Sequence, residues 1–273
     1  MKVLLGDYPV THALRSGAIR PPFPIAFDEV ALPQHAFKRL VNDLAFDIAE
    51  IAVVTFLIAK AHGRPYRLLP AVVMARSPHP YLCYNASRGA LAPADLAGRK
   101  VGKRSYSVTT STWVREILFQ DYGVDAAKVR WVTFEAPHVK EFRDPPNVTR
   151  APEGQSMESM LLSGELDAAI LGDLPKDPRI RPLIPDPEGA AAAWRARTGA
   201  IHINHMMVAK DTVPSEQSDL FFSLLKESRE RAGNPDMTPF GLEENRRNLE
   251  VAIQTVHRQG LIPRRFTVEE LFA

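Results

Sequence analysis

Short apolar runs alternate with segments of helical periodicity along nearly the whole chain. The expected strands are residues 3–6, 25–30, 46–50, 67–75, 100–102, 129–135, 168–171 and 201–209. The expected helices are 33–46, 55–62, a helix that starts near 109, 157–163, 216–232 and 243–259. Strands that alternate with helices are typical of sheets covered by helices. The pattern therefore predicts an α/β protein.

The length of the chain, 273 residues, allows two domains. The order of elements predicts a two-lobed plan in which each lobe is a mostly parallel sheet flanked by helices. The first lobe would be discontinuous, 1–78 plus 205–273, and the second would be 79–204. Two crossover segments, near 74–81 and 202–207, would act as hinges. In such folds strand ends and helix N-termini meet at a cleft, so we expect the ligand in the cleft between the lobes.

Composition excludes several classes of protein. The chain has 34 Lys+Arg and 32 Asp+Glu, a net charge of +2, which predicts no nucleic-acid partner. Apolar runs are too short to insert into a membrane. A single cysteine, Cys83, rules out an internal disulfide framework, and neither metal-ligand spacing nor a nucleotide-binding glycine motif is present. We expect no metal and no cofactor, and leave open a homo-oligomer.

The first residues contain no apolar stretch of signal-peptide length and no cleavage site with small residues. This predicts a cytoplasmic protein, or a periplasmic one if a leader was removed from this sequence.

The segment GKRSYSVTTSTWVREIL, residues 102–118, carries six serine and threonine side chains within 105–112. One hydroxyl suffices to cap a helix, whose first turn also attracts anions, so the excess suggests a ligand cradle. The alternative is a polar loop with Trp113 in the core, and Arg115 would be a carboxylate partner or a surface residue. The expected ligand contacts are Ser105, Tyr106, Ser107, Thr109, Thr110, Trp113 and Arg115.

Glu50 closes the apolar run FDIAEIA, where an unpaired carboxylate would be costly. At the end of a strand beside a cleft it could serve as a general acid or base, and otherwise it would pair with a lysine or arginine. Asp7 and Tyr8 follow the first strand, where they would contact ligand or form a turn.

Two histidines flank Asn204 in the segment IHINHMMVA, residues 201–209. Strand alternation places His202 and Asn204 on one face and His205 on the other, which argues against a two-histidine metal site here. His205 could donate a proton beside the cleft, and Asn204 could contact ligand. The alternative is a histidine satisfied by backbone carbonyls.

Seven segments carry a resemblance to known proteins: FDIAEI, DLAGRKVG, SYSVTTSTWVREIL, YGVD, VRWV, GELDAAI and TGAIHINHMMV. In this order the chain resembles type 2 periplasmic-binding-protein folds, and within them the 4,5-dihydroxyphthalate decarboxylase group. The resemblance implies a cofactor-independent carbon–carbon lyase that decarboxylates a hydroxylated aromatic acid in the interlobe cleft. His205 or Glu50 would then protonate the ring carbon as CO2 leaves. The alternatives are a solute-binding or sensor protein for a small organic anion, without catalysis, and an enzyme of another class on the same fold.

One stretch departs from the pattern that the resemblance implies. After the first strand the group has arginines at two positions where this chain has Val10 and His12. A phthalate has two carboxylates that favour bidentate arginine partners. The departure points to a different, less anionic substrate, while leaving the fold prediction intact.

Overall fold

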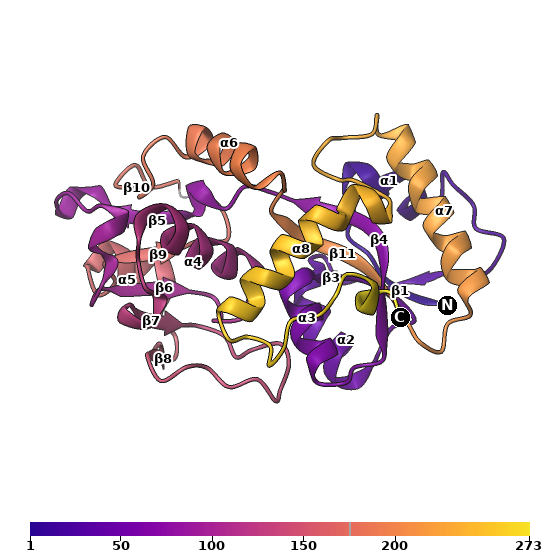
Figure 1. Ribbon diagram of the computed structural model, residues 1–273, viewed down its shortest axis with the longest axis horizontal. Coiled ribbons are helices and arrows are strands. Elements are labelled where there is room, and N and C mark those ends of the chain that lie inside the picture. The colour runs from indigo at the N-terminus through magenta and orange to yellow at the C-terminus, as the bar shows by residue number, and fades with distance from the viewer. Residues whose placement is uncertain (175) are drawn as a thin grey trace. The chain divides into compact units, whose positions relative to one another are not determined.

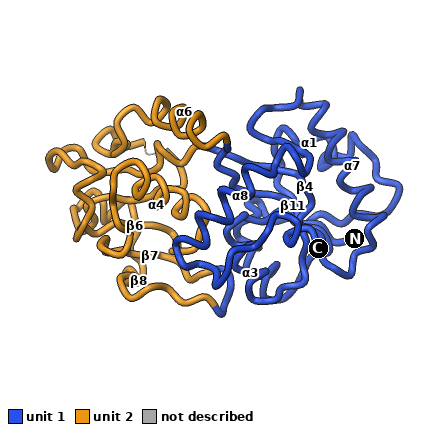
Figure 2. The backbone as a smooth tube through the Cα atoms, in the orientation of Figure 1, with its two compact units in different colours: residues 1–76, 138–141, 200–273 blue, residues 77–137, 142–199 orange. Residues whose placement is uncertain are grey.

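The computed structural model describes residues 1–174 and 176–273, which form two compact units (Figure 2). Unit 1 comprises Met1–Arg76, His138–Glu141 and Ala200–Ala273, and unit 2 comprises Ser77–Pro137 and Phe142–Gly199. The segment His138–Glu141, which the sequence analysis placed in the second lobe, therefore belongs to unit 1.

The sheet of unit 1 has five strands in the order β2-β1-β3-β11-β4. Strand β1 is parallel to β2 and β3, whereas β11 is antiparallel to β3 and β4. The strands are β1 Lys2–Leu4, β2 Ala26–Phe27, β3 Ile48–Ala52, β4 Tyr66–Ala75 and β11 Ile203–Lys210. The parallel pairing predicted for this sheet thus holds only on the side of β1, because the late strand β11 returns through its middle.

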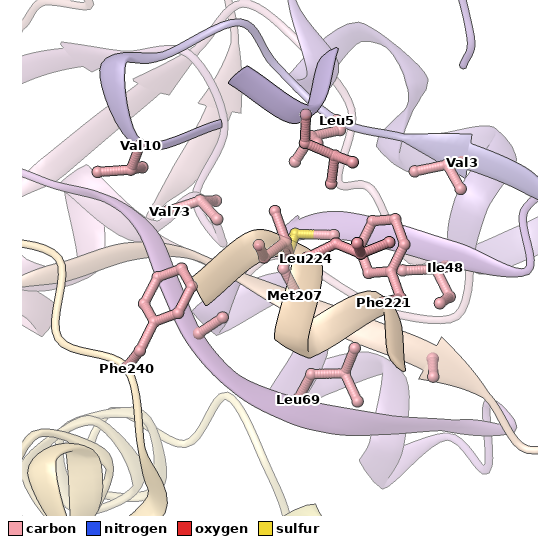
Figure 3. Close-up of a cluster of buried hydrophobic side chains, with 14 of the residues drawn as sticks. Val3, Leu5, Val10, Ile48, Leu69, Val73, Met207, Phe221, Leu224 and Phe240 are labelled. Atoms are coloured by element: carbon pink, nitrogen blue, oxygen red, sulfur yellow. The ribbon is translucent and has the colours of Figure 1, made fainter. Parts of the chain in front are cut away.

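Helices cover both faces of this sheet (Figure 1). The helices of unit 1 are α1 Pro9–Arg15, α2 Phe37–Asp43, α3 Val53–Ala61, α7 Ser215–Arg231 and α8 Leu242–Arg258. Helices α1 and α7 bury Val10, Phe221 and Leu224 against Ile48 and Met207 of the sheet (Figure 3). Val10, at one of the two positions that depart from the family pattern, is therefore a core residue. Helices α3 and α8 pack against each other, and α3 also contacts β3 and β11.

The sheet of unit 2 has six strands in the order β10-β5-β9-β6-β7-β8. The pairs β9–β6, β6–β7 and β7–β8 are parallel, and β10–β5 and β5–β9 are antiparallel. The strands are β5 Leu82–Asn85, β6 Lys100–Lys103, β7 Arg130–Thr133, β8 Val148–Arg150, β9 Ala168–Ile170 and β10 Ile180–Pro182. The helices are α4 Thr109–Tyr122, α5 Met157–Ser163 and α6 Pro187–Thr198.

The two faces of this second sheet differ in character. One face carries an apolar cluster with α5, in which a Cβ on Gly102 would lie 2.5 Å from Leu166 Cδ1, so a larger residue there would displace Leu166. Side chains alternate along a strand, so Lys103 and its neighbour Trp131 on β7 lie on the opposite face, with α4. That face buries charged groups, including Lys103 and Arg115.

Most expected elements are present with shifted ends. The helix 157–163 is observed as Met157–Ser163 and ends at Gly164, whose φ of 82° is the left-handed conformation expected for a glycine cap. Strand β3 runs on to Ala52, so Glu50 lies within the strand and not at its end, which corrects the sequence analysis. Helices α1 and α6 and strands β5, β8 and β10 were not predicted.

Candidate functional site

Glu50 is fully buried in β3 and accepts three hydrogen bonds. Its Oε2 accepts the Gly6 backbone N–H at 2.7 Å. Its Oε1 accepts the Tyr8 hydroxyl at 2.6 Å and faces His205 Nδ1 at 2.5 Å. A buried carboxylate is tolerated only where such donors replace water. The lysine or arginine pairing considered from the sequence is not found among the described residues, where the ion-pair partner of Glu50 is His205.

Strand order explains why these groups meet. Strand β3 lies between β1 and β11, and the pair Leu4↔Ala49 brings the residues after β1 beside Glu50. On the other side Met207 is opposite Glu50, and His205 lies two residues further along the same face. Diagonal neighbours of this kind are within reach of long side chains. The pairing of β11 with β4 is irregular around His205, and such bulges re-aim side chains.

The turn between β1 and α1 fixes Tyr8 over Gly6. A Cβ on Gly6 would lie 2.5 Å from Tyr8 Cζ and 2.6 Å from its hydroxyl oxygen, so the ring occupies the space of a side chain. Thr11 is buried and closes the turn, because its Oγ1 donates to Gly6 O at 2.7 Å and accepts the Tyr8 N–H at 2.9 Å. Tyr8 therefore reaches Glu50 only because residue 6 is glycine.

His205 has its two ring nitrogens in different environments. Carboxylate oxygens only accept hydrogen bonds, so Nδ1, which faces Glu50, carries a proton. The side chain is 8% exposed, and its other nitrogen, Nε2, makes no hydrogen bond within the described part of the chain. An edge-to-face contact with Phe37, at 5.3 Å between centroids, limits how the ring can turn. This arrangement leaves Nε2 chemically able to exchange a proton.

Tyr8 stays protonated in this cluster. Burial raises the pKa of its phenol well above the ordinary value, and the charge of Glu50 and the hydrogen bond to it add to this effect. Arg15 opposes the shift only in part. Tyr8 is therefore a fixed hydrogen-bond donor to Glu50.

A second histidine lies near this cluster and was not selected from the sequence. His138 is buried, its Nδ1 lies 2.8 Å from Thr55 Oγ1, and Asn42 Nδ2 donates to its backbone carbonyl at 2.8 Å. Its ring meets Phe37 edge-on at 5.5 Å, so Phe37 contacts both histidines. The sequence around His138 gives no local sign of a site, because the residues on either side of 138–141 belong to unit 2 and only these four residues belong to unit 1.

The hydroxyl-rich segment of unit 2 joins β6 to α4. The N-cap residue of α4 is Val108, which makes no side-chain cap, so the hydroxyls do not serve as an N-cap. Thr112 Oγ1 donates back to Val108 O at 3.1 Å inside the helix. All the hydroxyl-bearing residues of this segment except Thr110 are buried; they are Ser105, Tyr106, Ser107, Thr109, Ser111 and Thr112.

Arg115 and Trp113 support this segment from inside unit 2. Arg115 is 1% exposed, so it is not a surface residue. Its Nη1 donates to Tyr106 O at 2.8 Å and its guanidinium lies 4.0 Å from the centre of the Tyr106 ring. Trp113 is buried against Trp194 of α6, with 6.1 Å between ring centroids. The core position considered for Trp113 is the one observed.

The remaining predicted contacts lie outside the Glu50 cluster. Asp7 is exposed and faces His12 Nδ1 at 2.9 Å, on the surface of unit 1. Asn204 is buried in β11 next to His205. Within 1–174 and 176–273, no group of three or more histidine, cysteine or acidic side chains could hold a metal ion. In the same residues no helix has the length and apolarity needed to cross a bilayer.

Two curated relatives are similar to the chain over most of its length. The 4,5-dihydroxyphthalate decarboxylase of Comamonas testosteroni is 27% identical over 283 residues, which cover 88% of this chain and 86% of the relative. That of Pseudomonas putida is 32% identical over 207 residues, which cover 71% of this chain and 80% of the relative. The chain belongs to the 4,5-dihydroxyphthalate decarboxylase family. The resemblance found in the sequence is thereby confirmed.

The fold agrees with this assignment to the decarboxylase family. The periplasmic aliphatic sulphonate binding protein SsuA of Escherichia coli superposes with a TM-score of 0.59 at 12% identity, covering 100% of this chain and 96% of that one. At this identity the likeness concerns the fold alone, and it confirms the α/β, two-lobed, periplasmic-binding-protein-like architecture. No protein-family model matches the chain.

Proposed function

We propose that the chain is a carboxy-lyase acting on a hydroxylated aromatic acid of the 4,5-dihydroxyphthalate type. The single observation that supports this most strongly is the buried cluster of Tyr8, Glu50 and His205, in which Nδ1 of His205 faces Glu50 and Nε2 makes no hydrogen bond within the described residues. A histidine held by a buried carboxylate can carry a proton to a reacting atom. Family membership supplies the substrate class.

The reaction replaces a ring carboxylate by hydrogen. The ring carbon that bears the carboxylate first takes a proton from His205 Nε2; the bond from this carbon to the carboxylate then breaks, CO2 leaves, and the electron pair of that bond restores the aromatic ring. In 4,5-dihydroxyphthalate each carboxylate is para to a hydroxyl, which stabilises positive charge at the protonated ring before CO2 departs. One proton is consumed, and the organic product is 3,4-dihydroxybenzoate.

Glu50 and Tyr8 act through His205 in this scheme. The Glu50 carboxylate stabilises the doubly protonated imidazolium of His205, which donates the proton from Nε2. After the transfer, the Nδ1–H group of His205 is still hydrogen-bonded to Glu50. The Tyr8 hydroxyl and the Gly6 amide hold that carboxylate in place. After each turnover Nε2 takes a new proton from water. No metal or cofactor is required by these steps.

The hydroxyl-rich segment of unit 2 is proposed to bind substrate. Ser105, Ser107, Thr109 and Thr110 provide hydroxyls around the start of α4, where backbone N–H groups and the helix dipole favour an anion. Tyr106, held by Arg115, offers an aromatic face.

The test is incubation of the purified protein with hydroxylated benzoates and phthalates, with thermal shift and CO2 release measured together. In D2O, the wild-type product should carry deuterium at the carbon that lost CO2. We expect Glu50→Gln to bind but turn over about 100- to 10,000-fold more slowly. His257→Gln, on the exposed surface of α8, is the matched control and should keep the wild-type rate. Stabilisation by ligand without CO2 release would instead indicate a solute-binding protein.

A further inference from the structure

Lys103, at the end of β6, has a buried amine with no hydrogen bond. Its side chain is 0% exposed, and Nζ has no hydrogen-bond partner within the described residues. Nζ lies 3.7 Å from the ring centre of Trp131 and 3.9 Å from that of Tyr106. Lysine is almost never fully buried without a partner, so such a group calls for a functional explanation.

The charges around this amine are unbalanced. Arg115, from α4, is also buried and shares the Tyr106 ring with Lys103. The carboxylate that acts on both is Asp144, in the loop before β8, and it also interacts with Arg150 of β8. Among the described residues, the charges that act on one another here are those of three cations, Lys103, Arg115 and Arg150, and of one carboxylate, Asp144. Positive charge therefore exceeds negative charge in this set.

This imbalance affects protonation. Burial holds the pKa of the Lys103 amine well below its usual range, the positive charge of Arg115 adds to this, and Asp144 opposes it. Burial also raises the pKa of Asp144, against the pull of Arg150, Lys103 and Arg115. The protein without ligand therefore disfavours the charged form of the Lys103 amine relative to a lysine in water.

The amine lies next to the hydroxyl-rich segment. Ser105, two residues after Lys103, is also buried, and its Oγ has no partner within 1–174 and 176–273. The segment leads into α4, a helix of 14 residues whose N-cap, Val108, offers no side-chain acceptor. Of the two rings that contact Nζ, Trp131 is fully buried and Tyr106 is 5% exposed.

We propose that Lys103 is the proton-accepting cation of an anion subsite formed with Ser105 and the first turn of α4. Binding of an aromatic carboxylate at this subsite is accompanied by uptake of a proton on Nζ, so that the missing negative charge arrives with the ligand. The choice of an aromatic carboxylate as ligand rests on the proposed function. The buried amine of Lys103 and the unpaired hydroxyl of Ser105 are observed independently of that function. No covalent bond forms, and the proton comes from solvent.

The coupling is large enough to measure. A negative charge about 6 Å from the amine raises its pKa by about two units at an effective dielectric constant of about 20. At a pH between the pKa of the amine without ligand and its pKa with ligand bound, ligand binding changes the amine from mostly neutral to mostly charged. Proton uptake should therefore pass through a maximum as pH is varied, and affinity should rise as pH falls through this range.

The experiment is titration calorimetry with phthalate, which lacks the ring hydroxyls that promote loss of CO2. The heat is measured in pairs of buffers with unequal ionisation enthalpy, across about pH 6 to 9, where both carboxylates are ionised. We expect the wild type to take up about one proton at the maximum. Lys103→Met should abolish the uptake and weaken binding about tenfold or more. Lys100→Met, on the same strand but exposed, is the matched control and should behave as the wild type.

A histidine could also take up a proton on ligand binding, so His205→Gln is measured alongside. The proposal requires uptake to persist in His205→Gln. It is overturned if the wild type binds phthalate with no proton uptake across this range, a result that does not depend on whether Lys103→Met folds. Uptake that disappears in His205→Gln and remains in Lys103→Met overturns it as well.

These outcomes separate the subsite from the proposed function. CO2 release from 4,5-dihydroxyphthalate with proton-neutral binding would contradict the role of Lys103 and leave the decarboxylase intact. Proton uptake on binding, lost in Lys103→Met, with no CO2 release would support the subsite and contradict the decarboxylase. No saturable binding of any aromatic carboxylate would contradict both.

Discussion

Replacing Gly6 with alanine should disrupt the Glu50 cluster through Tyr8. The backbone of Gly6 is not in the left-handed region, so alanine meets no conformational strain there. Its Cβ would, however, lie 2.5 Å from Tyr8 Cζ, where ordinary contacts begin at 3.4 Å. The ring must therefore move by about 1 Å. This takes the 2.6 Å hydrogen bond from Tyr8 to Glu50 beyond bonding range.

Two opposing contributions decide whether Gly6→Ala raises or lowers the free energy of unfolding. A hydrogen bond to a charged group contributes about 1.5–3 kcal/mol, and a glycine-to-alanine change gains about 0.4–1 kcal/mol by restricting the unfolded chain. We expect Gly6→Ala to lower the free energy of unfolding by about 1–2 kcal/mol. In a Tyr8→Ala background the clash is absent, so the same substitution should be neutral or stabilising.

The assay is urea unfolding of the four proteins of this double-mutant cycle, with turnover measured in parallel. The reversal of sign isolates the contact between residues 6 and 8 from any general intolerance of alanine. An equal loss of stability in both backgrounds would refute the reasoning, because it would show that Tyr8 does not cause the cost.

Three further predictions concern stability and proton transfer. Tyr8→Phe should remove one donor from Glu50 and slow turnover while substrate affinity changes little, as steady-state kinetics would show; a change in KM alone would contradict this. Gly102→Ala should destabilise the protein by about 1–3 kcal/mol in urea unfolding, because its Cβ would meet Leu166; unchanged stability would contradict the close packing. Burial, and less so Arg197, lowers the pKa of His79 to about 4. Since the unfolded state then binds the proton more readily, wild-type stability should fall as pH drops from about 6.5 to about 4, by at most about 3 kcal/mol. His79→Gln should flatten this dependence in unfolding measured against pH, and an unchanged slope would exclude His79 as its source.

Local sequence patterns predicted those helices and strands whose ends are set by residues next to them in the sequence. The helix Met157–Ser163 was predicted with its ends because a capping serine precedes it and a left-handed glycine follows. Edge strands β8 and β10 have only three residues each, and their hydrogen bonds come from neighbouring strands, so no pattern within them indicates a strand. Helix α1 has only seven residues, from Pro9 to Arg15 before the C-cap Ser16, too few to show helical periodicity.

The candidate site was predicted in its parts and not in its arrangement. Glu50 and His205 were selected from the sequence, but the strand-end position of Glu50 was wrong. A carboxylate in mid-strand is stable here only because Gly6, Tyr8 and His205 donate to it, from 44, 42 and 155 residues away. Such partners come from sheet order, which a single sequence does not reveal.

Lys103 was overlooked for a related reason. In the sequence it stands in the cationic stretch before the hydroxyl-rich segment and reads as a solvated residue. Strand alternation in β6 places it instead beneath α4, between two aromatic rings that are 3 and 28 residues further along the chain.

The central claim is that His205 delivers the proton that replaces the departing carboxylate. The most direct test is the rate of CO2 release from 4,5-dihydroxyphthalate by the wild type and by His205→Gln, with substrate binding measured separately. The account predicts wild-type turnover, and in His205→Gln retained binding with CO2 release slowed at least about 100-fold. CO2 release at the wild-type rate from His205→Gln would contradict it.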